Sequence, residues 1–135
     1  MEDYKNQQRV SNAAIKIYEK YNDGKYKEIV LFKKGIFNAL SDCYKKLSIE
    51  KEIIQCEQLP MSLLTTYTNH TYFFLNNITD KINDCLAHDQ KKDNGTLDTR
   101  IQSCIQNKHI EQYFADQMSI LISKQNKLLE KYKLI

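Results

Sequence analysis

The stretch 29–47, IVLFKKGIFNALSDCYKKL, decides the fold class of this chain. Its apolar residues recur at steps of three and four, at Ile29, Phe32, Ile36, Leu40, Cys43 and Leu47. Because that period matches the turn of an α-helix, these side chains share one face. The stretch therefore predicts an amphipathic helix with Cys43 on its buried side.

The other three cysteines follow isoleucines at the same helical steps: Cys56 after Ile49 and Ile53, Cys85 after Ile78 and Ile82, and Cys104 after Ile101. Four inward-facing cysteines favour disulfides, although free cysteines also serve as small buried hydrophobes. If the helices pair antiparallel, the order of the cysteines suggests nested bridges. The outer bridge would join Cys43 to Cys104, and the inner one would join Cys56 to Cys85.

The composition predicts an all-α protein. The chain has 135 residues but only one proline and three glycines, too few for the many turns of a β-fold. We expect one domain, an antiparallel helical hairpin or a small bundle of long helices, disulfide-stapled.

Four helical segments are expected within residues 1–135. An N-terminal helix covers 1–22, and residues 26–88 form two helices broken at Pro60, because proline disfavours helix at the residue before it. Residues 89–98, DQKKDNGTLD, are polar throughout and predict a loop. A long C-terminal helix covers 99–133.

The charge pattern excludes some classes of protein. The net charge is +3, and basic and acidic residues are interleaved rather than gathered on a basic face, so we expect no nucleic-acid partner. No apolar run approaches the roughly 20 residues of a membrane span, so any membrane contact is expected to be peripheral and through partners. The first five residues, MEDYK, have neither a secretory nor a presequence character, so import would need an internal signal.

No catalytic, cofactor-binding or metal-binding residue is predicted, and we expect a protein that is not an enzyme. His70, His88 and His109 stand near charged or loop positions, and no nucleophile motif surrounds a cysteine. Cys85 and His88 have a workable helical spacing for zinc, but the paired-ligand knuckle of structural zinc sites is missing.

Two windows resemble a known family. The segment 36–46, IFNALSDCYKK, resembles the first cysteine motif of the small Tim chaperones of the mitochondrial intermembrane space. The segment 104–110, CIQNKHI, looks like the end of their second motif. The resemblance implies a bridge from Cys43 to Cys104, with Leu47 and Arg100 where the family has its inner cysteines. Cys56 and Cys85 would then belong to an insertion.

These features together predict a helical accessory subunit of a mitochondrial inner-membrane complex of the respiratory type. It would reside in the intermembrane space and act by protein–protein binding. Two alternatives stay open: a small Tim-like import chaperone for hydrophobic precursors, and a cytoplasmic helical interaction protein with reduced thiols.

Overall fold

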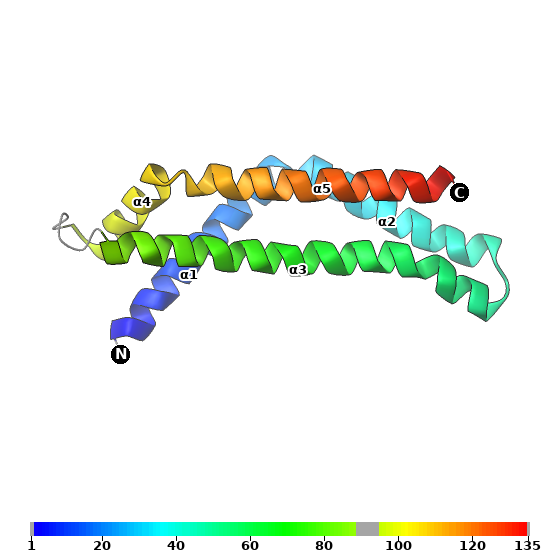
Figure 1. The fold of residues 1–135 in the computed structure, drawn as a ribbon, viewed down its shortest axis with the longest axis horizontal. Helices are drawn as coiled ribbons and strands as arrows, with labels where there is room; N and C mark the ends of the chain where they lie inside the picture. Colours follow the sequence, from blue (N-terminus) through cyan, green and yellow to red (C-terminus); the bar gives the residue numbers. More distant parts are fainter. Residues whose placement is uncertain (1, 89–94, 135) are drawn as a thin grey trace. The chain divides into compact units, whose positions relative to one another are not determined.

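The computed structural model describes residues 2–88 and 95–134, and that part of the chain is almost entirely helical (Figure 1). Its helices are α1 Glu2–Gly24, α2 Tyr26–Lys46, α3 Glu50–His88, α4 Leu97–Asn107 and α5 Ile110–Leu134. No strand occurs among the described residues. The prediction of an all-α, disulfide-stapled protein is confirmed.

The predicted break at Pro60 is wrong, because the helix breaks earlier. Helix α2 ends at Lys46, and Leu47 is extended, with φ −120° and ψ 142°. Basic side chains in the last turn of α2 and Glu50 in the first turn of α3 complement the opposite dipoles of the two helix ends. Pro60 lies buried inside α3, which bends near its N-terminal end (Figure 1).

The single helix expected over 99–133 is also wrong, since α4 and α5 are separate. The Lys108 N–H closes α4 on the Cys104 carbonyl, and His109 has a left-handed φ of 51° before α5 begins. Helix α4 starts earlier than expected, because Thr96 caps it by accepting a hydrogen bond from the Thr99 N–H. Of the expected 89–98 loop, residues 89–94 lie outside the described residues.

The chain divides into two compact units, whereas one domain was expected. Unit 1 comprises Met1–Gly24 and Tyr72–Gln117, and unit 2 comprises Lys25–Thr71 and Met118–Ile135. Helix α1, which covers the predicted 1–22 helix, and helix α4 belong to unit 1, and α2 belongs to unit 2. Helices α3 and α5 contribute residues to both units.

Unit 2 is built from α2, the first part of α3 and the last part of α5. Phe32 of α2 meets Tyr67 of α3 with ring centroids 5.4 Å apart. The Gln125 side chain of α5 donates to the Leu63 carbonyl of α3 at 3.0 Å. Its buried side chains include Phe32, Ile36, Ala39, Cys43, Leu63, Tyr67, Met118, Leu121 and Leu129.

Unit 1 is built from α1, the last part of α3, α4 and the first part of α5. Phe114 of α5 is met edge-on by Tyr18 and Tyr21 of α1, with centroids 6.2 and 5.6 Å away. Helix α1 also packs against α4. The buried side chains of this unit include Val10, Ala14, Ile17, Ile78, Ile82, Cys85, Ile101, Cys104, Ile105 and Ile110.

Candidate functional site

Each unit contains one disulfide, and each disulfide joins consecutive helices. Cys43 of α2 bonds Cys56 of α3, with Cα atoms 5.8 Å apart, in unit 2. Cys85 of α3 bonds Cys104 of α4, with Cα atoms 5.9 Å apart, in unit 1. Both Cα distances are ordinary for a protein disulfide. The bridges fix each helix pair close to the connection between its two helices.

The predicted nested pairing, Cys43 with Cys104 and Cys56 with Cys85, is therefore wrong. The error follows from the misplaced helix break. With one helix running past residue 47, Cys43 and Cys56 would lie roughly 20 Å apart along its axis and could not bond. Because α2 ends at Lys46, the chain reverses direction between α2 and α3 (Figure 1). This reversal lets the sulfurs of Cys43 and Cys56 bond.

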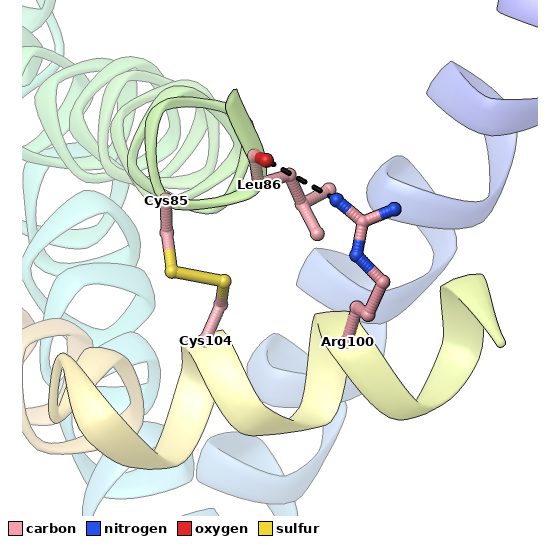
Figure 2. The surroundings of a disulfide bond; sticks show 4 residues. All are labelled: Cys85, Leu86, Arg100 and Cys104. Carbon is pink, nitrogen blue, oxygen red and sulfur yellow. Dashed lines mark hydrogen bonds between the residues drawn. A yellow bond between two sulfur atoms is a disulfide. The ribbon is translucent and has the colours of Figure 1, made fainter. Parts of the chain in front are cut away.

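Arg100 adds a second link between α3 and α4 beside their disulfide. It lies four residues before Cys104, so both side chains leave α4 on the same face (Figure 2). The Arg100 Nη2 group donates to the Leu86 carbonyl at 3.2 Å, and Leu86 follows Cys85. A hydrogen bond from a charged donor to a half-buried carbonyl is stronger than one between neutral groups. Arg100 thus holds the same two helices that the disulfide joins.

Tyr44 and Glu57 make the corresponding polar contact beside the other disulfide. Each follows one of the bonded cysteines, Cys43 and Cys56. A hydrogen bond to the Glu57 side chain, together with its negative charge, raises the pKa of the Tyr44 hydroxyl above its ordinary value of 10.0. The pair α2 and α3 and the pair α3 and α4 are therefore each joined by one disulfide and one adjacent polar contact.

Two small cavities lie in unit 1. One, of about 260 Å³, is lined by Asn6, Gln7, Val10, Asn83, Leu86, Leu97 and Arg100. The buried Arg100 Nε has no hydrogen-bond partner among the described residues. The other, of about 290 Å³, is lined by Lys81, Asp84, Cys85, His88 and Lys108.

The sulfur chemistry of this second cavity is that of a disulfide. Cys85 and Cys104 are bonded to each other, so neither sulfur is available as a thiolate for a metal or a nucleophilic step. Within residues 2–88 and 95–134, no group of three His, Cys, Asp or Glu side chains is arranged to hold a metal ion.

The two units differ in charge and in exposed apolar surface. Unit 2 has eleven Lys or Arg against six Asp or Glu, a formal charge of +5, whereas unit 1 has nine against eleven, a charge of −2. Thirteen large apolar side chains of the described residues are exposed, and ten of them belong to unit 2. These ten are Tyr26, Val30, Leu31, Phe37, Tyr44, Ile49, Ile54, Met61, Ile120 and Leu128.

Comparisons with known proteins add no assignment. A scan against protein-family models, a search of curated proteins and a search of solved structures each found no match. In the part of the chain that is described, no helix combines the length and the apolar character needed to cross a bilayer.

The sequence predicted which residues form disulfides but missed their polar neighbours. Arg100 and Glu57 were not expected to contribute, because their roles depend on which helices are paired. One signal was available: Lys45 and Lys46 followed by Glu50 and Glu52 change the sign of charge across a short gap, a pattern typical of one helix ending and the next beginning.

Proposed function

We propose that this protein is a non-enzymatic binding protein, a helical accessory subunit of a larger protein assembly. The observation that carries the proposal is the concentration of exposed large apolar side chains on unit 2. Large exposed apolar surface on a folded domain is typical of a site that binds another molecule. A fixed subunit covers such a surface permanently in its assembly.

The compartment belongs to the same proposal. Disulfides persist in oxidising compartments, and all four cysteines are paired here. Of these compartments we propose the mitochondrial intermembrane space, with the assembly a respiratory-type complex of the inner membrane. The sequence around Cys43 and Cys104 supports this choice by its resemblance to the small Tim chaperones, although the disulfide pairing differs from that family's.

A second candidate function is supported by the same exposed apolar surface. An import chaperone would use it to shield hydrophobic precursor segments in transit. The two functions differ in the lifetime of the complex: a subunit keeps one partner, whereas a chaperone releases each client. A cytoplasmic protein with reduced thiols is the least supported alternative, because both cysteine pairs stand at bonding distance.

The test is to tag the chain in its own cells and divide the sample in two: one half is separated by size as native membrane complexes, and the other is quenched with acid and then alkylated to read the thiol state. A fixed subunit co-migrates with one large complex at constant stoichiometry, and its cysteines resist thiol alkylation. A free small oligomer that crosslinks to many hydrophobic precursors would replace this proposal with the chaperone. Alkylated cysteines in a cytoplasmic fraction would contradict both the compartment and the proposed assembly.

A further inference from the structure

One side of α2 carries an exposed apolar stripe, which we call the α2 outer stripe: Tyr26, Val30, Phe37 and Tyr44. Their side chains are 69, 41, 55 and 63% exposed. The spacing is four, seven and seven residues, so at 100° per residue they fall within roughly 40° of one line along the helix. Leu31 of α2 is also exposed, but it lies on another side of the helix and is not part of the stripe.

The α2 outer stripe is distinct from the face that α2 uses in its own unit. The buried residues of α2 are Ile29, Phe32, Ile36, Ala39 and Cys43. They lie roughly a third of a turn around the helix from the stripe. Helix α2 is thus apolar on two sides, and only one of them is buried in unit 2.

The seven-residue repeat of the stripe is typical of a helix that packs along another helix. Val30, Phe37 and Tyr44 occupy the same heptad position. The position three residues later in the repeat holds Tyr26, Lys33 and half-buried Leu40. A repeat of this kind keeps the contact line facing one partner helix over several turns.

The charges that α2 itself places beside the stripe are positive. Lys27 and Lys34 follow one edge at the same seven-residue spacing, and Lys33 lies within the repeat, with its Nζ 5.6 Å from the centre of the Tyr67 ring. The acids of α2, Glu28 and Asp42, lie on other sides of the helix. Glu57 of α3 reaches the end of the stripe at Tyr44.

We propose that the α2 outer stripe is the docking site for an amphipathic helix of a protein partner whose apolar line is edged by Asp or Glu. This specifies the partner chemistry of the accessory-subunit function and rests on that proposal. The edge lysines and the +5 charge of unit 2 complement an acidic helix. A second copy of α2 would bring lysine edge against lysine edge, which disfavours self-association.

The test uses the full-length oxidised protein and a fluorescent synthetic helix of three heptads, with Leu on its apolar line and Glu on both edges. A matched peptide carries Lys in place of Glu. Fluorescence anisotropy should show binding of the Glu peptide that weakens with added salt, and binding of the Lys peptide at least about tenfold weaker. No binding of the Glu peptide, or equal binding of both, overturns the proposal.

Matched variants locate the contact. Phe37→Ser should weaken binding of the Glu peptide by about tenfold, because the variant lacks the apolar side chain that the peptide would bury. Leu31→Ser, on the same helix and 62% exposed but outside the stripe, should leave binding unchanged. Lys34→Glu should weaken it and restore binding of the Lys peptide. Circular dichroism checks that each variant folds. Equal effects of Phe37→Ser and Leu31→Ser overturn the assignment.

Other occupants give different results. Binding of the protein to phosphatidylserine vesicles that Phe37→Ser abolishes, without peptide binding, would make the stripe a membrane contact and overturn the proposal. A concentration-dependent dimer that Phe37→Ser dissociates would do the same. If the Phe37→Ser chain still co-migrates fully with its native complex, this docking site is wrong while the accessory-subunit function stands.

Discussion

Removing either disulfide should lower the free energy of unfolding by a similar amount, because each disulfide closes a short loop of similar length. Cys43 and Cys56 are separated by 13 residues, and Cys85 and Cys104 by 19. In the chain-entropy account, loops of these lengths each contribute about 3 kcal/mol to the free energy of unfolding. The double variants Cys43→Ser/Cys56→Ser and Cys85→Ser/Cys104→Ser should therefore each lose about 3 kcal/mol in urea unfolding followed by circular dichroism.

The mismatched variant Cys43→Ser/Cys104→Ser is the discriminating control. It leaves Cys56 and Cys85, which belong to different units and have no bonding partner in the observed pairing. When its thiols are titrated in denaturant, it should show two free thiols, and its free energy of unfolding should fall by roughly 6 kcal/mol, the sum of both bridges. If this variant is free of reactive thiols and more stable than the two matched variants, the reasoning from sequential pairing fails.

Three further perturbations test particular contacts. Gly35→Val should lower the free energy of unfolding by about 1–3 kcal/mol, because a Cβ at Gly35 would lie 2.9 Å from Cδ2 of the buried Leu129; an unchanged urea midpoint would contradict that packing. His109→Gly should raise the free energy of unfolding by about 1 kcal/mol, since glycine adopts the φ of 51° without strain; a less stable variant would show that the His109 side chain contributes. Glu57→Gln should lower the pKa of Tyr44 toward 10.0, measured by NMR of ring-labelled tyrosine. Because the pKa of Tyr44 is raised in the folded protein, the Tyr44–Glu57 contact stabilises the fold below pH 10 and stops doing so as the pH rises through the folded pKa. If the Tyr44 pKa is the same in Glu57→Gln as in the native protein, the contact is excluded.

Helical periodicity made the fold class predictable from the sequence. The stripe from Ile29 to Cys43 and the scarcity of glycine and proline are local signals, and the helices depend on them directly. The inward position of Cys43, Cys85 and Cys104 followed from the same period, and all three are buried.

The helix ends were harder to predict because one local rule conflicts with packing and two of the ends carry no glycine or proline signal. Proline is expected to end a helix, but Pro60 is buried, and the surrounding contacts of α3 offset the lost backbone hydrogen bond. Leu47 and His109 interrupt helices with no glycine or proline at either position.

The disulfide pairing was unpredictable for the same reason. Four cysteines allow three pairings, and the choice depends on where the chain reverses. Once α2 ends at Lys46 and α4 begins at Leu97, each reversal places one cysteine opposite the next along the chain. The contacts of Arg100 and Glu57 depend on the same reversals.

The central structural claim is that each compact unit is closed by its own disulfide, and the methionines allow a direct test. Cyanogen bromide cleaves after Met1, after Met61, which lies between the two bridges, and after Met118. Sequential pairing predicts that the unreduced fragments 2–61 and 62–118 separate, each with a mass that rises by two hydrogens on reduction. A single covalent species containing both fragments, separable only by reduction, would contradict the account.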